Sequence, residues 1–423
     1  MKIAIEGCAH GELDKIYASL QKLEQQQNVK IDLLICCGDF QAIRNEDDME
    51  CMSVPIKYRS MGTFYKYYSG ELVAPYLTVF IGGNHEAANY LWELYHGGWA
   101  APNIYFLGYA GVVKFGGLRI GGASGIWSGA DFRKGHFERP PYRGLSDLKS
   151  AYHIREYDVF RLKQLQSPLD IFISHDWPRG IYNHGNSRRL LQNKRFFAEE
   201  VSKNTLGSPA NEQLLKALQP DYWFSAHLHC KFAALVSHSS GRTTKFLALD
   251  KCLPRRDFLQ LVDFPDTDKP LKLEYDVEWL SIVRATHGYI SLNKLQASLP
   301  GMSAATAVSL ESHHQAVQEL LQHRKSADIP LNFETTAPPY CASNPRKPRM
   351  PQKALHNPQT VAFLKSLQLE YNLDTTLALS NDSELPPPPP PSHGELHEQV
   401  RSSSNPEEID LGDDEVEDGD VGQ

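Results

Sequence analysis

Hydrophobic and polar positions in the first 250 residues fall into two kinds of segment. Short runs that are apolar throughout predict strands covered on both faces. The stretch 14–26 has apolar residues at helical spacing and predicts an amphipathic helix. Strands are predicted at 2–6, 31–37, 76–81, three times within 104–123, and at 170–174 and 222–225, with hairpin-like runs at 232–236 and 246–249. This order predicts an α/β fold, a layered β-sandwich flanked by helices.

The pattern changes beyond residue 250. Alternating runs continue through 254–292 and a helical stretch follows at 303–323, so residues 251–370 are predicted to form a C-terminal α+β domain after a catalytic domain at 1–250. The proline- and base-rich stretch 338–351 predicts a linker or extended arm, and 360–369 a short amphipathic segment that docks on the body. Six consecutive prolines, serines and acidic residues come later, so 371–423 is predicted to be a disordered tail.

The formal net charge of -8 is unevenly distributed. Residues 407–423 carry nine carboxylates and no Lys or Arg, whereas residues 1–406 have a net charge of +1. Residues 114–203 hold 16 Lys and Arg against nine Asp and Glu, a local charge of +7. The seven cysteines are irregularly spaced, which argues against a disulfide scaffold, and no apolar run approaches the ~20 residues that span a bilayer. We therefore expect a soluble intracellular protein without a membrane partner.

Metal-ligand residue types follow five of the predicted strands. Loops at the carboxyl ends of neighbouring strands in an open α/β sheet converge on one crevice, so we expect these side chains to meet. One carboxylate can bridge two metal ions ~3.5–4 Å apart, an arrangement that suits phosphoryl transfer. In chain order the residues are Cys8 and His10, then Asp39, then Asn84 and His85, then His175, and finally His227 and His229.

Each of these residues alone has an ordinary structural explanation. An isolated Asn-His or His-x-His is more often a turn or a satisfied core group than a ligand set. Gly-Asp after a strand is commonly a turn, and free cysteine is among the most buried residue types. The combination carries the prediction, because five separate strand ends deliver ligand types to one place.

The motifs resemble those of the calcineurin-like metallophosphoesterases, whose pattern is D-x-H, G-D, G-N-H-[DE], H and G-H-x-H. Two positions depart from that pattern, because Cys8 stands where most members have Asp and Ala226 replaces the last glycine. Both departures, with the segments IEGCAHGELDKIY and SHDWPRGIYNHG, are similar to the RNA lariat debranching enzymes. The resemblance covers residues 1–250 with specific motifs and the following region with weaker ones.

The resemblance implies two metal sites that share Asp39. One ion would be held by Cys8, His10, Asp39 and His229, and the other by Asp39, Asn84, His175 and His227. His85 would be the general acid, since an imidazole with an ordinary pKa of ~6.5 suits proton transfer at cellular pH. Glu86 is a candidate to orient the His85 ring, with a local surface contact as an equal alternative. Thiolate is softer than carboxylate, so Cys8 favours Fe or Zn over Mg, and the two ions are predicted to be Fe, Zn or Mn.

The basic stretch 114–203 interleaves cations with aromatic residues, a combination that single-stranded RNA binding requires. For any one residue, a solvated surface or a core position is the ordinary alternative. The Gly- and Pro-punctuated residues 124–155 correspond to a lariat-recognition loop in the family, and long loops of this kind are often functional. The candidate substrate contacts are Trp127, Arg133, Lys134, Tyr142, Arg143, Trp177 and Arg179.

The resemblance implies metal-dependent hydrolysis of the 2′-5′ phosphodiester at the branch point of excised intron lariats, and this bond specificity rests on the resemblance alone. Another metallophosphoesterase, either a nuclease or a protein phosphatase, is an alternative, and a non-catalytic scaffold is a weaker one. The +7 stretch argues against a phosphatase, and the complete ligand set argues against a scaffold. We expect branched RNA as partner, splicing-associated proteins at the tail, and a nuclear location compatible with the basic run 346–353.

Overall fold

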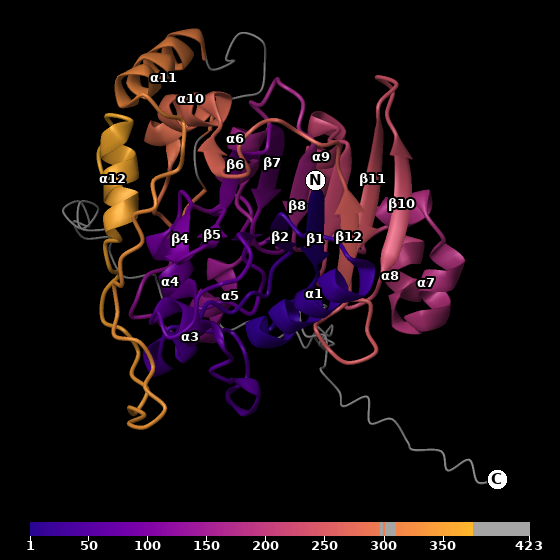
Figure 1. Ribbon diagram of the computed structural model, residues 1–423, viewed down its shortest axis with the longest axis horizontal. Helices are drawn as coiled ribbons and strands as arrows, with labels where there is room; N and C mark the ends of the chain where they lie inside the picture. Colours follow the sequence, from indigo (N-terminus) through magenta and orange to yellow (C-terminus); the bar gives the residue numbers. More distant parts are fainter. Residues whose placement is uncertain (297–298, 301–309, 375–423) are drawn as a thin grey trace, which may run out of the picture. The chain divides into compact units, whose positions relative to one another are not determined.

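Two β-sheets pack face to face, with helices on their outer sides (Figure 1). The computed structural model describes residues 1–296, 299–300 and 310–374, and these described residues belong to one compact unit. In spatial order, the first sheet contains β12 (Leu259–Asp263), β1 (Lys2–Glu6), β2 (Leu33–Cys36), β3 (Thr78–Phe80), β5 (Ile104–Phe106) and β4 (Gly98–Ala101). The second contains β10 (Phe232–Ser237), β11 (Thr243–Ala248), β9 (Tyr222–Ser225), β8 (Ile171–Ser174), β7 (Leu118–Ala123), β6 (Ala110–Phe115) and β13 (Leu273–Tyr275). The predicted α/β fold class is confirmed.

The central strands of each sheet run parallel. In the first sheet β1, β2, β3 and β5 are parallel neighbours, and in the second β7, β8, β9 and β11 are. The edge strands β12, β4, β10 and β13 pair antiparallel with their neighbours. The parallel strands therefore send the loops that follow them to one edge of their sheet, which is where the predicted ligands lie.

Strand residues alternate between two hydrophobic cores, which explains why the strands are apolar throughout. Ile3 and Ile5 of β1 lie in the core between the sheets, where Ile171 and Ile173 of β8 meet them. Ala4, between the two isoleucines, lies instead in the core beneath α1 and α3. Since successive strand residues point to opposite faces, only a strand covered on both sides can be apolar at every position.

Short helices cover the sheets. The predicted helix at 14–26 is present as α1, which buries Leu13, Ile16 and Leu20. No helix of the described chain is long and apolar enough to cross a membrane. The α-helices are α1 (Leu13–Gln27), α2 (Glu46–Met49), α3 (Phe64–Tyr68), α4 (Ala88–Glu93), α5 (Leu145–Ala151), α6 (Glu156–Leu162), α7 (Ser187–Asn193), α8 (Ala198–Lys203), α9 (Pro209–Leu218), α10 (Val277–Thr286), α11 (Glu311–Arg324) and α12 (Pro358–Ser366). Short 3-10 turns lie at Ile56–Tyr58, Ile181–His184, Arg195–Phe197 and His287–Tyr289.

The chain beyond residue 250 contributes strands to both sheets. β12 pairs with β1, and β13 pairs with β6, so this region completes the sandwich. The alternating run around β13 becomes α10, because the Asp276 side chain accepts a hydrogen bond from the Trp279 N–H at 2.9 Å and caps a helix there. α11 overlaps the predicted helical stretch 303–323, of which 303–309 falls outside the described residues. The domain boundary at residue 250 stays a prediction.

The packed chain extends past the predicted start of the tail. Leu373 is fully buried beside Trp92, Tyr95 and Tyr157. Residues 371–374 are therefore part of the folded body rather than of the tail to which they were predicted to belong. Residues 375–423, which include the acidic block, lie outside the described residues.

Candidate metal centre

Four predicted ligands from three strand ends meet in one place. They are Cys8 and His10 after β1, Asp39 after β2, and His229 after β9. One ligand atom from each residue lies within 4.8 Å of all the others. Ligand atoms bound at ~2.0–2.3 Å around one zinc-sized ion are up to about 4.6 Å apart, so this cluster has the dimensions of a single metal site.

The remaining ligands gather on the other side of Asp39. The Nε2 atom of His175 lies 3.2 Å from Asn84 Oδ1 and 3.3 Å from Asp39 Oδ1, and the His227 and His175 ring centroids are 5.0 Å apart. The second oxygen of Asp39, Oδ2, lies 3.8 Å from His10 Nε2. Asp39 thus presents one oxygen to each ligand set and would suit a carboxylate shared by two ions.

Several ligands sit on backbone in the left-handed region. The φ angles are 44° at His10, 47° at Asp39, 64° at His227 and 48° at His229. Non-glycine residues adopt this conformation rarely, and sparsely populated conformations cost on the order of 1–3 kcal/mol each. Such sharp turns directly after the strands bring the four side chains back into the crevice, and the surrounding fold holds them there.

Two glycines of the motifs are required by close approach. A Cβ atom at Gly38 would lie 2.3 Å from His175 Nδ1, and one at Gly83 would lie 2.2 Å from Asp39 Oδ1. Gly38 also has a φ of 110°, which favours glycine. Any side chain at either position would occupy the space of a ligand.

Burial favours the neutral, ligating form of three imidazoles, whereas the pKa of His175 is raised because Asp39 outweighs the effect of burial there. Burial lowers the pKa of His10 to about 4, that of His227 to about 3 and that of His229 to about 2. Burial alone would raise the pKa of Asp39, but His175, His85 and His10 bring it well below its usual value. Neutral imidazole and ionised carboxylate are the forms that bind metal.

The Cys8 thiol differs from its neighbours in the cluster. Burial, and then the charges of Asp39 and Glu6, raise its pKa well above the usual value. The backbone N–H of His227 donates to Cys8 Sγ at 3.2 Å and favours the thiolate. A metal ion would supply the stronger stabilisation of the thiolate, since metal binding releases the thiol proton. The donor set therefore fits a divalent ion with affinity for sulfur and nitrogen.

Glu86 supports the two ligand loops. Its carboxylate accepts the backbone N–H groups of Phe40 at 2.8 Å, Gln41 at 2.9 Å and Gly83 at 2.9 Å, and it is almost fully buried. These bonds join the loop after β2 to the loop after β3. The alternative of a local surface contact for Glu86 is wrong, because its side chain is buried and both oxygens accept backbone N–H groups; a role in orienting the His85 ring stays a prediction.

Gln41 is a supporting residue that sequence reasoning missed. Its Nε2 atom lies 3.4 Å from His10 Nδ1, and its φ angle is 57°. A metal-bound histidine usually engages its second ring nitrogen in such a contact, which fixes the ring. The position of Gln41 two residues after Asp39 was the sequence feature that could have indicated this supporting role.

His85 lies at the rim of the cluster. Its backbone N–H donates to Asp39 Oδ1 at 3.0 Å, and its half-buried ring is 5.4 Å from the His10 ring between centroids. The side chain is thus next to both ligand sets and accessible to a bound substrate.

Two candidate substrate rings are in the interior. Trp177 is fully buried, donates from Nε1 to the Ala226 carbonyl at 2.7 Å and stacks on Phe232. Tyr142 is buried in a small cluster with Cys51, Ala88, Leu148 and Ala151. Neither ring offers an open face to a nucleobase in this structure.

The other candidate contacts lie nearer the surface. Arg133 and Arg143 are exposed, and Trp127 is half-buried. Lys134 is paired with Asp131 at 2.6 Å, and Arg179 with Glu212 at 2.8 Å, so RNA would compete with a carboxylate for these two. Their roles in substrate binding remain predictions.

Comparison with known proteins identifies the family. Residues 1–231 match the family described as Calcineurin-like phosphoesterase, and residues 241–372 match Lariat debranching enzyme, C-terminal domain. The chain is 56% identical to Lariat debranching enzyme A of Xenopus laevis, over 87% of this chain and 70% of that protein. The chain belongs to the lariat debranching enzymes. It is also 51% identical to the lariat debranching enzyme of Homo sapiens, over 99% of this chain and 76% of that protein. The lariat debranching enzyme of Arabidopsis thaliana is likewise 51% identical, over 91% of this chain and 90% of that protein.

Membership of the debranching enzymes confirms the resemblance of the motifs. The protein is a phosphodiesterase hydrolase of the calcineurin-like class, and its activity depends on divalent metal. The alternatives of a protein phosphatase, another nuclease or a scaffold are not favoured, because relatives matched over most of the chain are debranching enzymes.

Proposed function

We propose that this protein hydrolyses the 2′-5′ phosphodiester bond at the branch point of excised intron lariats and so releases a linear RNA for turnover. The observation that carries the proposal is the cluster of Cys8, His10, Asp39 and His229, whose ligand atoms lie within 4.8 Å of one another beside His85. Membership of the lariat debranching enzymes supports the choice of substrate.

Two divalent ions, Fe, Zn or Mn, would complete the centre. Cys8, His10, Asp39 and His229 would hold one ion, and Asp39, Asn84, His175 and His227 the other. When bound, such a pair polarises a phosphate and lowers the pKa of a shared water. The sulfur of Cys8 favours the softer ions at the first position.

The protein groups orient the reaction. Asp39 is fixed between the ligand sets by the His85 N–H at 3.0 Å, and Glu86 ties together the two loops that carry these residues. Water adds to phosphorus as the bond to the 2′-oxygen breaks, and the His85 side chain gives that oxygen a proton. The products are an RNA with a 5′-phosphate and a branch nucleotide with a restored 2′-hydroxyl.

We propose that the loop 124–155 recognises RNA, and its position beside the metal ligands supports this. Its base is closed by the Ile154 N–H, which donates to the Ile126 carbonyl at 2.9 Å. The Gly125 N–H donates to the Gly82 carbonyl at 2.8 Å, and the Trp127 N–H donates to Asp176 Oδ2 at 3.2 Å. Gly82 lies two residues before Asn84 and Asp176 follows His175, so the loop starts at the metal centre.

A synthetic branched RNA tests the proposal when incubated beside its 3′-5′ linear isomer with Mn, Fe or Zn. The expected result is cleavage at the branch, no cleavage of the isomer, and loss of activity with a chelator. Equal cleavage of both substrates, or an intact branch with every metal, would refute the assignment.

A nuclear location is part of the same proposal, because branched introns arise there. The exposed basic side chains within 346–353 support it, since short basic runs act as import signals. Splicing-associated proteins are proposed partners of the tail. A fluorescent fusion with Lys347 and Arg349 replaced should lose nuclear enrichment, and an unchanged distribution would remove this support.

A further inference from the structure

The segment between α11 and α12 is an extended arm. Residues 330–357, called here the C-terminal arm, contain no helix or strand and run past α3 and α4 (Figure 1). The arm carries the basic run 346–353, for which the metal centre provides no role.

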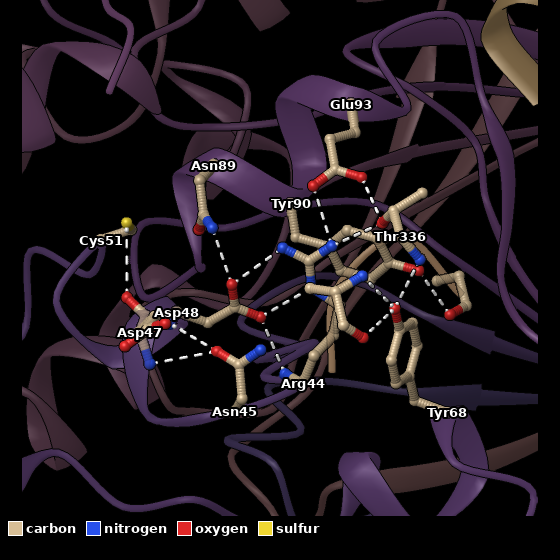
Figure 2. Close-up of polar contacts among 12 residues, drawn as sticks. Arg44, Asn45, Asp47, Asp48, Cys51, Tyr68, Asn89, Tyr90, Glu93 and Thr336 are labelled. Carbon is tan, nitrogen blue, oxygen red and sulfur yellow. Dashed lines mark hydrogen bonds and ion pairs between the residues drawn. The ribbon is translucent and has the colours of Figure 1, made fainter. Parts of the chain in front are cut away.

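A buried arginine anchors the start of the arm (Figure 2). The Arg44 guanidinium pairs with Asp48 and Glu93, each at 2.8 Å, and lies 3.9 Å over the Tyr90 ring. It also donates to Thr336 Oγ1 at 2.8 Å, and that hydroxyl donates to Glu93 Oε2 at 2.6 Å. Arg44 is fully buried, so this clamp is shielded from water and salt.

Further bonds hold the rest of the arm along the loop that follows Asp39. Asn45 Nδ2 donates to the Pro338 carbonyl at 2.8 Å, and the Tyr340 N–H donates to the Arg44 carbonyl at 2.7 Å. The Arg349 N–H donates to Asp47 Oδ1 at 2.9 Å. The backbone of the arm is therefore fixed at several points, which reduces the ordering cost of binding a ligand.

The arm lies against the proposed recognition loop. Met350 packs on the cluster formed by Cys51, Ala88, Tyr142, Leu148 and Ala151. Tyr142 and Leu148 belong to the loop 124–155, and Ala88 is three residues beyond His85. Through Met350, the basic run therefore contacts side chains of the loop 124–155 and of the helix that follows His85.

The residues that precede Met350 in the arm include exposed cations. Lys347 and Arg349 are both exposed, as is Arg143, which follows Tyr142 in the loop. Arg346 is partly neutralised by Glu46, at 3.5 Å. Two cations on the arm and one on the loop therefore lie on adjoining segments at the surface.

We propose that Lys347 and Arg349 form a second phosphate-binding site, which holds the single-stranded RNA that leaves the branch. The inference rests on the proposed function for its substrate, and its ligand is the phosphodiester backbone without regard to sequence. Exposed Lys and Arg on a fixed backbone neutralise phosphates and release counterions, which makes affinity depend on salt.

The test compares the full-length protein with a double variant, Lys347→Gln with Arg349→Gln. Binding of single-stranded RNA is measured across a salt series, with turnover of a long-tailed branched RNA and of one truncated near the branch. Losing two single-strand phosphate contacts should make the slope of log affinity against log salt concentration shallower by about 1.4. Between ~50 and ~200 mM salt, the affinity of the variant should therefore fall by a factor roughly sevenfold smaller than that of the wild type. KM should rise for the long-tailed substrate only, and kcat should stay unchanged.

A matched control removes two exposed charges elsewhere. Lys22 lies in α1 and Lys30 precedes β2, at the edge of the sheet opposite the ligands, so Lys22→Gln with Lys30→Gln should bind RNA as the wild type does. An unchanged slope in the arm variant, or an equal loss in the control, would overturn the inference. Failure of the wild type to cleave the branch would count against the proposed function, while the binding slopes would still decide the role of the arm.

Discussion

Replacing Gly83 by alanine would place a methyl group between the two halves of the metal centre. The new Cβ would lie 2.2 Å from Asp39 Oδ1 and 2.7 Å from His175 Nε2, whereas ordinary van der Waals contact begins at 3.4 Å. The Asp39 backbone nitrogen lies 2.5 Å from the new Cβ as well, so both the backbone and the carboxylate of Asp39 would have to move by about 1 Å, and a displacement of that size costs about 10²-fold in rate. This loss corresponds to roughly 2.7 kcal/mol in the activation barrier.

The assay is turnover of a branched RNA together with the rise in Tm on adding Mn or Zn. We expect Gly83→Ala to remain folded, since Gly83 is not in the left-handed region, but to lose about 10²-fold in turnover and most of the metal-induced rise in Tm. Gly288→Ala is the matched control, because nothing lies within 4 Å of its Cβ position. A turnover of Gly83→Ala within threefold of the wild-type value, which is a change of about 0.65 kcal/mol in the activation barrier, would refute the geometry inferred for Asp39.

Three further substitutions test separate parts of the site. His85→Ala should reduce turnover by about 10²–10⁴-fold with metal content unchanged, and retained turnover would exclude it as the general acid. Cys8→Asp should shift metal preference in thermal melts from Zn towards Mn, whereas an unchanged order would show that sulfur does not select the ion. Trp177→Phe removes one of the two donors to the buried Ala226 carbonyl, which keeps the Leu228 N–H at 2.7 Å, so chemical denaturation should show a loss of about 0.5–1.5 kcal/mol from this bond while RNA affinity stays unchanged. Weakened RNA binding at wild-type stability would instead make Trp177 a substrate contact.

The ligand positions were accessible from the sequence because each follows a recognisable apolar strand. Parallel strands of one sheet end at the same edge, so Cys8 and Asp39, which follow β1 and β2, could be placed near each other without any coordinates. His175 follows β8 of the other sheet, so its approach to Asp39 depends on how the two sheets pack. The backbone geometry was not accessible in this way. Nothing in the sequence around His229 indicates a left-handed residue, because the surrounding fold imposes that conformation.

The other features that the sequence did not predict depend on contacts between segments that are distant in the chain. The aromatic residues of the basic stretch look alike in sequence, yet Trp177 is in the core because Phe232 stacks on it. Arg44 gave no signal, since its partners Glu93 and Thr336 are remote in the chain. The alternating runs that became β12 and β13 were visible, but the strands with which they pair could not be read from their own residues.

The fate of a heavy oxygen from water tests the account most directly. A single turnover of branched RNA in oxygen-labelled water, followed by mass spectrometry of both products, shows which bond breaks. The account predicts label in the 5′-phosphate of the released RNA and none in the 2′-hydroxyl of the branch nucleotide. Label in that hydroxyl, or an unlabelled phosphate, would contradict hydrolysis at phosphorus with departure of the 2′-oxygen.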